Sequence, residues 1–297
     1  MYYGSIEAGG TKFVCAIGDS NFNVVDRISF PTVKPDETLA NVFEFFDKYE
    51  LLSIGIGSFG PIDVNPTSST YGYVTTTPKP HWGNYNFLGA VKGRYDFPIG
   101  WTTDVNVAAL GEQVLGAAQG LNSCLYLTVG TGIGGGAVVG DEMLSGYSHP
   151  EMGHIIVRPH PEDDFAGVCP YHGNCLEGLA SGPAIEKRFG VKADQLDKDH
   201  IAWTFVAHYI AQAVMSYALI LSPEKVILGG GVMSQAHLFP MIREELKQLV
   251  AGYVVLPSLE DYVVPPALGN NSATVGCFML AKSKQNKIKN CVASMTI

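Results

Sequence analysis

Two short glycine-threonine segments, each set between two apolar runs, constrain this chain more than any other feature of its sequence. The first is Glu-Ala-Gly-Gly-Thr-Lys at residues 7–12, and the second is Gly-Thr-Gly-Ile-Gly-Gly-Gly at residues 130–136. An apolar run, a glycine turn and a second apolar run predict a β-hairpin whose turn lacks bulky side chains. Such a turn exposes backbone N–H groups, and several N–H groups that point the same way bind anions.

Each segment also has a simpler interpretation, because glycine and threonine are ordinary hairpin residues. Neither segment has the Gly-x-x-x-x-Gly-Lys-Ser/Thr pattern of P-loop nucleotidases, and neither opens a helix as a Rossmann fingerprint does. The argument therefore rests on the pair, with hydroxyls from Thr11 and Thr131 and a cation from Lys12. Two such turns in one chain favour a polyphosphate ligand such as ATP.

Composition excludes several classes of partner. The 297-residue chain is 46% hydrophobic and 16% charged, as expected for a globular protein with a large core. Its net charge of −9 argues against a nucleic-acid partner, because Lys and Arg clusters bind phosphate backbones. The first residues do not resemble a signal peptide, and the best apolar candidate for a membrane span, residues 211–221, is short and contains Gln212 and Ser216. We expect a cytoplasmic protein with no membrane partner.

Hydrophobic periodicity predicts similar alternations of strands and helices in both halves of the chain. In the first half it predicts strands at 2–6, 13–18, 24–30, 52–56 and 99–103, and helices around 39–46, 88–95 and 105–117. In the second half it predicts strands on both sides of the second glycine segment, a strand at 225–228, and helices at 201–221, 239–250 and 272–282.

The repeated hairpin predicts two similarly built α/β domains with a cleft between them. We place a smaller domain at residues 1–117 and a larger one at 118–271. The C-terminal helix, about residues 272–297, is a candidate to pack onto the first domain.

Asp104 lies where a predicted strand ends and a helix begins, in Thr-Thr-Asp-Val-Asn at residues 102–106. One interpretation is an N-cap, which accepts hydrogen bonds from the free N–H groups of the first helical turn. The other is a general base that takes a proton from an attacking hydroxyl. The two interpretations are compatible.

Six cysteines occur at positions 15, 124, 169, 175, 277 and 291. Cys169 and Cys175 flank His172 at two-residue gaps in a loop, and His154 lies upstream. Thiolate and imidazole ligands at this spacing suit tetrahedral Zn²⁺ in a closed, structural Cys₂His₂ set. The alternatives are a disulfide between the two cysteines, or surface residues with no shared role. Glu151 and Glu177 bracket this loop, where their carboxylates could accept hydrogen bonds from sugar hydroxyls, and the second His154 nitrogen could face the same substrate.

Taken together, these segments resemble the ROK family of sugar kinases and repressors along nearly the whole chain. The match covers both glycine segments, the Asp104 segment (residues 103–112), Glu-Met-Gly-His at 151–154, the Cys/His loop at 169–175, and Gly-Gly-Gly-Val-Met at 229–233. The resemblance implies two actin-like, hexokinase-like (ribonuclease H-like) α/β domains with an interdomain cleft. It also implies ATP, Mg²⁺ and structural Zn²⁺ as cofactors, and a homodimer.

The resemblance assigns residues to roles. Asp104 is the expected catalytic base, and the expected zinc ligands are His154, Cys169, His172 and Cys175. The expected ATP and phosphate contacts are Gly9, Gly10, Thr11, Lys12, Gly130, Thr131, Gly132, Pro183, Gly229, Gly230, Gly231, Val232 and Met233. The expected sugar contacts are Gly60, Pro61, Thr103, Asp104, Glu151, His154 and Glu177.

Within the family the chain is most similar to bacterial fructokinases, through its Glu-Ala-Gly-Gly-Thr-Lys opening, Thr-Pro-Lys-Pro-His-Trp at 77–82, and the Cys-x-x-His-x-x-Cys loop. This similarity implies transfer of phosphate from ATP to the 6-hydroxyl of D-fructose. Many relatives have Asp at the position of Glu7, and glucokinase-like relatives have Asn at the position of Thr103. Kinases of mannose, glucose or other hexoses are the alternatives within the class, and a non-catalytic sugar sensor is the alternative outside it.

Overall fold

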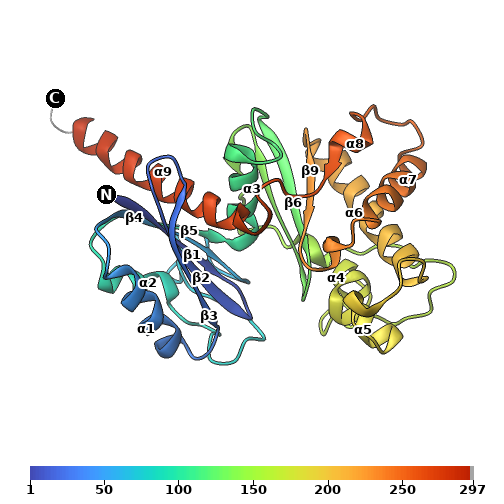
Figure 1. Ribbon diagram of the computed structural model, residues 1–297, viewed down its shortest axis with the longest axis horizontal. Helices are drawn as coiled ribbons and strands as arrows, with labels where there is room; N and C mark the ends of the chain where they lie inside the picture. The colour runs from blue at the N-terminus through green and yellow to red at the C-terminus, as the bar shows by residue number, and fades with distance from the viewer. Residues whose placement is uncertain (295–297) are drawn as a thin grey trace. The chain divides into compact units, whose positions relative to one another are not determined.

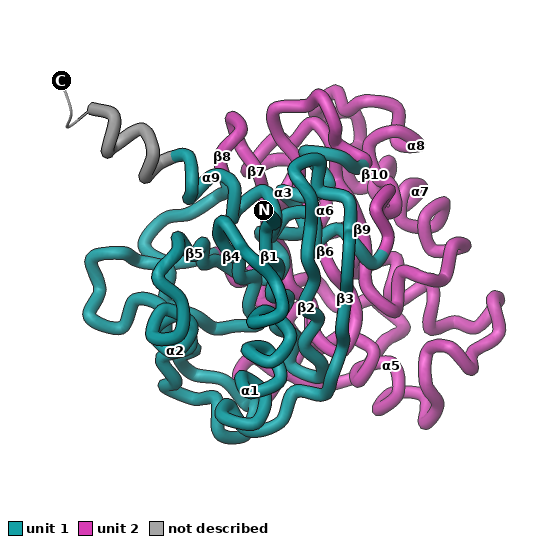
Figure 2. Tube along the Cα trace, turned by 60° about the vertical axis from the view of Figure 1, so that its left-hand side comes forward, with its two compact units in different colours: residues 1–116, 143–149, 270–297 teal, residues 117–142, 150–269 magenta. Residues whose placement is uncertain are grey.

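The computed structural model describes the backbone of residues 1–294 and the side chains of residues 1–286. The side chain of Cys291 therefore lies outside the described residues, and so do residues 295–297 of the expected C-terminal helix. The chain divides into two compact units (Figure 2). Unit 1 contains residues 1–116, 143–149 and the chain from 270 onward, and unit 2 contains residues 117–142 and 150–269. The segment 143–149, placed in the second domain from sequence, groups with unit 1.

Unit 1 is built on a five-stranded sheet in the order β3-β2-β1-β4-β5 (Figure 1). Its strands are β1 (Tyr2–Ala8), β2 (Lys12–Gly18), β3 (Val24–Pro31), β4 (Leu51–Ser58) and β5 (Ile99–Thr103). Strands β1 and β2 form an antiparallel hairpin, while β1, β4 and β5 run parallel. The predicted strands of this half are confirmed to within a few residues.

Different helices cover the two faces of this sheet. Strand β4 alternates small and large residues, so its glycines lie on one face and its isoleucines on the other. The helices of unit 1 are α1 (Pro35–Phe46), α2 (Phe87–Arg94), α3 (Asp104–Leu115) and α9 (Ser272–Ser294). A Cβ at Gly55 would lie 2.0 Å from the backbone oxygen of Cys277 in α9, and one at Gly57 would lie 2.3 Å from Val107 in α3. These glycines let α9 and α3 approach the sheet closely, and α9 in turn packs against α3.

An aromatic core fills the space on the α1 and α2 side of this sheet. Trp82 is fully buried, and its ring contacts the rings of Phe13, Phe59 and Phe87. Its indole N–H donates to the backbone oxygen of Val33 at 2.7 Å. Burial of a polar indole is favourable here because its one donor is paired.

Unit 2 repeats the same plan with a sheet in the order β10-β9-β6-β7-β8. Its strands are β6 (Ser123–Val129), β7 (Ile133–Val139), β8 (Glu142–Met143), β9 (Val226–Gly229) and β10 (Val263–Val264). Strands β6 and β7 form an antiparallel hairpin, and β9 runs parallel to β6. The predicted repeat of the hairpin is therefore confirmed, and so is the α/β class.

The longest helix of unit 2 is α6 (Ala202–Leu221), with 20 residues. The other helices of this unit are α4 (Leu176–Ala180), α5 (Gly182–Phe189), α7 (Leu238–Val250) and α8 (Leu259–Tyr262), with 3₁₀ turns η1 (Met152–His154), η2 (Ala193–Gln195) and η3 (Val232–Ser234). A fourth 3₁₀ turn, η4 (Gly269–Asn271), precedes α9.

Helix α6 corrects one expectation drawn from sequence. Its 20 residues are long and apolar enough to cross a membrane by length and composition, so the expectation that no stretch reaches that length is wrong. However, 61% of its most apolar stretch is buried by the rest of the fold, and it packs against α7 and α4. The apolar character of α6 is that of a core helix, whose buried face supports the unit.

Candidate functional site

Three segments with predicted roles begin at the same edge of the unit 1 sheet. Because β1, β4 and β5 are parallel and in register, Ala8 lies beside Ser58, and Ser58 lies beside Thr103. The first glycine turn follows Ala8, the loop with Gly60 and Pro61 follows Ser58, and Asp104 follows Thr103. Ligands of α/β proteins bind at the carboxyl ends of parallel strands, so this edge is the candidate site in unit 1.

The first glycine turn closes the β1/β2 hairpin with a hydrogen bond from Gly9 N to Lys12 O at 3.0 Å. Gly10, Thr11 and Lys12 are all exposed. Within the described residues, the N–H groups of Gly10 and Thr11 have no hydrogen-bond partner. The turn therefore offers unpaired donors and a lysine cation at the sheet edge, as the sequence predicted for a phosphate cradle.

Glu7 lies on β1 directly before this turn, with a carboxylate that suits a divalent cation. Its Oε2 atom is buried and lacks a hydrogen-bond partner among the described residues. Burial raises the pKa of Glu7, while the charges of Arg27 and Lys12 oppose that shift. A buried carboxylate oxygen without a donor fits a hard cation such as Mg²⁺ or a water bound to it.

Asp104 is the first residue of α3, but it is not the N-cap. Thr103 is the N-cap, and its Oγ1 accepts from Asn106 N at 3.2 Å. Asp104 Oδ1 accepts from Val105 N at 2.9 Å, and the side chain is half-buried. The N-cap interpretation of Asp104 is therefore wrong, because the preceding threonine already fills that position. A carboxylate at a helix N-terminus is stabilised by the helix dipole, which suits a group that must stay ionised to accept a proton.

The loop after β4 is held by partners that sequence reasoning missed. Pro61 O accepts from both the N–H and the hydroxyl of Thr75, at 2.8 and 3.0 Å. Ile62 N donates to His149 Nε2 at 3.1 Å. The Gly60–Pro61 peptide bond is cis. Thr75 and His149 lie 14 and 87 residues from the atoms that they hold, so no local pattern could have identified them.

In unit 2, the second glycine turn and the third glycine cluster also begin at one sheet edge. Thr128 at the end of β6 pairs with Gly229 at the end of β9. Gly230 has φ +92°, and a Cβ there would lie 2.5 Å from Val129 O, so only glycine lets the cluster pass this close to β6. Gly231 is exposed, whereas Val232 and Met233 are buried in η3.

The start of helix α5 and the Glu177 side chain both form hydrogen bonds with the second glycine turn. Gly182 N donates to Gly130 O at 2.8 Å, which places the start of α5, with Pro183, beside the turn. Glu177 Oε2 accepts from Ile133 N at 2.9 Å. A Cβ at Gly132 would lie 2.7 Å from that same oxygen, so the missing side chain of Gly132 makes room for the carboxylate. Thr131, at the tip of the turn, is exposed.

The four predicted zinc ligands converge in unit 2. The ligand atoms of His154, Cys169, His172 and Cys175 all lie within 4.8 Å of one another. His154 Nδ1 lies 3.7 Å from Cys169 Sγ and 3.6 Å from Cys175 Sγ, and His172 Nδ1 lies 3.7 Å from Cys169 Sγ. In a tetrahedral site with Zn–S and Zn–N bonds of about 2.3 and 2.0–2.1 Å, sulfur and nitrogen are about 3.6 Å apart. The donor set and its spacing fit Zn²⁺.

The cysteines themselves exclude one of the alternatives. Cys169 and Cys175 are both buried and free, so the disulfide interpretation is wrong, and four converging donors are not scattered surface residues. Burial and the adjacent Cys169 thiol raise the pKa of Cys175 to about 11. A metal cation that binds both sulfur atoms displaces their protons and stabilises the resulting thiolates.

His154 connects the zinc cluster to Glu177. Its Nδ1 faces the thiols, and its Nε2 lies 4.0 Å from Glu177 Oε1. Both side chains are about one-quarter exposed, so they remain accessible to a small ligand. Glu151 precedes η1 and is also exposed, and its backbone oxygen accepts from His154 N at 3.1 Å.

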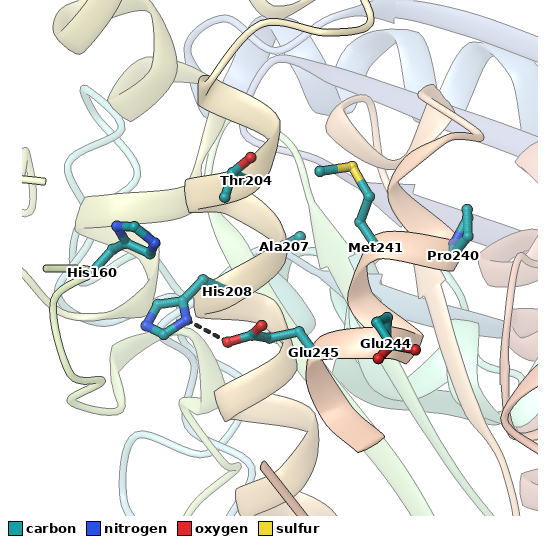
Figure 3. Close-up of a pocket in the computed structure, with 8 residues that line it drawn as sticks. All are labelled: His160, Thr204, Ala207, His208, Pro240, Met241, Glu244 and Glu245. Atoms are coloured by element: carbon teal, nitrogen blue, oxygen red, sulfur yellow. Dashed lines mark hydrogen bonds and ion pairs between the residues drawn. The ribbon is translucent and has the colours of Figure 1, made fainter. Parts of the chain in front are cut away.

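A cavity of about 420 Å³ lies elsewhere in unit 2, between α6 and α7 (Figure 3). None of the predicted site residues lines it. His208 Nδ1 and Glu245 Oε1 are paired across it at 2.6 Å, and His160 Nδ1 accepts from Glu162 N at 3.2 Å. The His208 and Glu245 side chains and the His160 Nδ1 atom therefore already have hydrogen-bond partners, unlike the N–H groups of Gly10 and Thr11.

Comparison with known proteins decides the family. The ROK family model matches residues 3–284. The chain belongs to the ROK family. A ROK relative from Bacillus subtilis is 53% identical over 282 residues, with 94% of each chain covered. The fructokinase of Pediococcus pentosaceus is 49% identical over 283 residues and covers 95% of this chain and 98% of its own.

A solved structure shows that the ROK fold extends over the chain. The ROK hexokinase from Thermus thermophilus matches with a TM-score of 0.79 and 26% identity, covering 98% of this chain and 100% of the hexokinase. The resemblance seen in the sequence is thus confirmed, and so is the actin-like, hexokinase-like α/β fold.

Proposed function

We propose that this chain is an ATP-dependent fructokinase that phosphorylates the 6-hydroxyl of D-fructose. Relatives named fructokinase are 40–49% identical over at least 94% of this chain. The observation that carries the proposal is the placement of Asp104 at the same sheet edge as the first glycine turn, with Thr103 as a separate N-cap. The fold thus places this carboxylate at the end of the sheet that also carries the unpaired N–H donors of the first turn.

Asp104 acts as the general base in this proposal. It takes the proton of the 6-hydroxyl while that oxygen forms a bond to the γ-phosphorus, and the bond between the γ-phosphorus and the β–γ bridging oxygen breaks to release ADP. The residues of the two glycine turns and Lys12 hold the phosphates and stabilise their charge, because phosphoryl transfer depends mainly on positioning and electrostatics. Gly229–Met233 and Pro183 hold the nucleotide further from the reacting atoms. Bound Mg²⁺ supplies charge neutralisation, and Glu7 is the residue that would hold it, directly or through water.

In this proposal the sugar contacts are the residues that the family resemblance assigns: Gly60, Pro61, Thr103, Asp104, Glu151, His154 and Glu177. Zn²⁺ is a structural ion that fixes the His154 tautomer, so that Nδ1 binds metal and Nε2 faces the sugar. We further propose that the protein is a cytoplasmic homodimer that binds neither nucleic acid nor membranes.

The decisive experiment measures ADP release with Mg·ATP and fructose, glucose, mannose or no sugar. We expect the highest kcat/KM with fructose. Asp104→Asn keeps the shape of the side chain but removes the base, so kcat should fall about 10²- to 10⁴-fold while the fructose KM changes little. Turnover on another hexose would retain the mechanism and change the substrate. Sugar binding by a folded, zinc-loaded protein without ADP release from any sugar would instead support a sugar sensor.

A further inference from the structure

Thr32, directly after β3, makes two hydrogen bonds to the first glycine turn. Its hydroxyl donates to Gly9 O at 2.7 Å, and its N–H donates to Thr11 O at 3.0 Å. Thr32 is only 5% exposed, so these bonds are shielded from competing water. No sequence motif pointed to this residue, which lies 23 positions from Gly9.

The bond to Gly9 O has a geometric consequence for the next residue. The carbonyl of Gly9 and the N–H of Gly10 belong to one planar trans peptide, so they point in opposite directions. When Thr32 holds the carbonyl toward the interior of unit 1, the Gly10 N–H must point outward. Glycine on both sides of this peptide permits either sign of φ, so the peptide could rotate if nothing held its carbonyl.

Two carbonyls that flank the turn are also paired within the protein. Ala8 O accepts from Phe59 N at 2.7 Å, and Lys12 O accepts from Gly9 N at 3.0 Å. These bonds leave the turn with outward N–H groups and few outward oxygens. An anion is attracted by the first and repelled by the second, so carbonyl pairing determines whether the turn can bind phosphate.

Thr32 can act as a rigid support because its own neighbours are fixed. Val33 O accepts from the buried indole of Trp82 at 2.7 Å, and Val33 N donates to Thr38 Oγ1 in α1 at 3.1 Å. Thr38 and Trp82 are fully buried. The segment that carries Thr32 is therefore anchored to the aromatic core of unit 1.

We propose that Thr32 is a positioning residue that orients the Gly9–Gly10 peptide so that the Gly10 N–H donates to a phosphate of ATP. The inference rests on the proposed function, because it assumes that the first turn binds the nucleotide. Thr32 does not touch the nucleotide itself; it acts through Gly9.

Two substitutions test the hydroxyl. Thr32→Val keeps the shape but removes the donor to Gly9 O, and Thr32→Ser restores it. We expect T32V to weaken the binding of Mg²⁺ with a non-hydrolysable ATP analogue, measured by calorimetry without sugar, by about ten- to one-hundred-fold, the usual range for loss of a hydrogen bond to a charged group. The KM for ATP should rise similarly, the KM for fructose should stay within twofold, and T32S should retain near wild-type nucleotide affinity.

A matched control comes from Thr75, whose hydroxyl donates to Pro61 O in the neighbouring loop of the same unit. Thr75→Val removes a comparable hydrogen bond but should leave nucleotide affinity unchanged. Wild-type nucleotide affinity in T32V would overturn the proposal, and so would equal losses in T32V and T32S or in T32V and T75V.

A measurement on the unsubstituted protein covers the case in which T32V does not fold. In an NMR titration with Mg²⁺ and the same analogue, the Gly10 amide signal should shift strongly, whereas the Gly9 amide, already paired with Lys12 O, should shift little. An unmoved Gly10 amide in a protein that binds the analogue would refute the role of Thr32 and leave the kinase proposal intact. Absence of fructose-dependent ADP release from wild type would instead refute the proposed function, whatever the Gly10 signal does.

Discussion

The first glycine turn is held by a neutral threonine, whereas the second is held by a carboxylate. Thr32 binds two carbonyls of the first turn, and Glu177 accepts the N–H of Ile133, the residue that follows Gly132 in the second turn. The support of the first turn leads back into the aromatic core of unit 1. The support of the second leads to His154 and the cluster of Cys169, His172 and Cys175. Turns of similar sequence are thus tied to different parts of the protein.

This difference determines which other residues each turn is coupled to. The other oxygen of Glu177 lies 4.0 Å from His154 Nε2, and His154 Nδ1 faces both cysteines. Residues proposed to hold sugar therefore also support the second turn. The support of the first turn instead continues from Thr32 to Val33, which is bonded to Trp82 and Thr38 within unit 1. We infer that a disturbance of the second turn reaches the proposed sugar residues of unit 2 through Glu177, and that a disturbance of the first turn that moves no protein atom leaves them unchanged.

The largest expected difference is in fructose affinity between the variants Gly132→Ala and Gly10→Ala. A methyl group at residue 132 would lie 2.7 Å from Glu177 Oε2, while one at residue 10 meets no protein atom within 4 Å. The Glu177 carboxylate must shift in G132A, which disturbs its bond to Ile133 N and its position beside His154, so we expect fructose affinity to fall about ten- to one-hundred-fold. G10A should leave fructose affinity within about twofold of wild type.

Fructose affinity is measured by calorimetric titration without nucleotide. A clash between the new methyl group and ATP then cannot affect the measured fructose affinity. Equal fructose affinity in G132A and wild type would break the inferred link between the second turn and the sugar residues. Equal losses in both variants would mean that either turn supports the sugar site.

The next effect in size comes from removing zinc. His172 is an exposed ligand with Nδ1 3.7 Å from Cys169 Sγ, so His172→Ala weakens the metal site without removing a buried side chain. We expect zinc content, measured by atomic emission, to fall and fructose affinity to drop about tenfold or more, because His154 loses its fixed orientation. Chelation of the wild-type protein should act in the same direction.

Nucleotide affinity is the control in the zinc experiment. It should fall less than fructose affinity, because the first turn and its support lie in unit 1. Equal losses of both affinities would show that the zinc loop supports the fold as a whole rather than the sugar residues.

The features read correctly from the sequence were local ones. The hairpins on either side of the glycine turns follow from apolar runs and turn residues within about ten positions, and the convergence of the Cys/His loop follows from a two-residue spacing. Strands β8 and β10 were missed because two residues show no period. Asp104 was misjudged as a possible cap because Thr and Asp are both good caps, and only the backbone shows which of them precedes the first helical residue.

The supports of the site could not be predicted from the sequence. Thr32, Thr75 and His149 hold backbone atoms that are 14 to 87 residues away, and a threonine at a strand end has no distinctive pattern. The second role of Glu177 also depends on the empty space beside Gly132, which only the folded chain shows. Residue type predicts which groups are candidates for binding, whereas tertiary contacts determine their orientation.

The smallest effect distinguishes the two glutamates beside the turns. Burial raises the pKa of Glu7 above its usual value of 4.5, so between that value and the raised pKa the folded protein holds a proton that the unfolded chain releases. The free energy of unfolding must therefore fall as pH rises through this interval, and stay lower above it. Without Mg²⁺, Glu7→Gln should be more stable than wild type at pH 7 and lose this advantage toward pH 4.5. Glu177→Gln should gain no stability, because Glu177 already accepts the N–H of Ile133. Urea unfolding at several pH values measures the free energy of unfolding of both variants. If this free energy depends on pH in the same way in wild type and E7Q, Glu7 carries no destabilising buried charge.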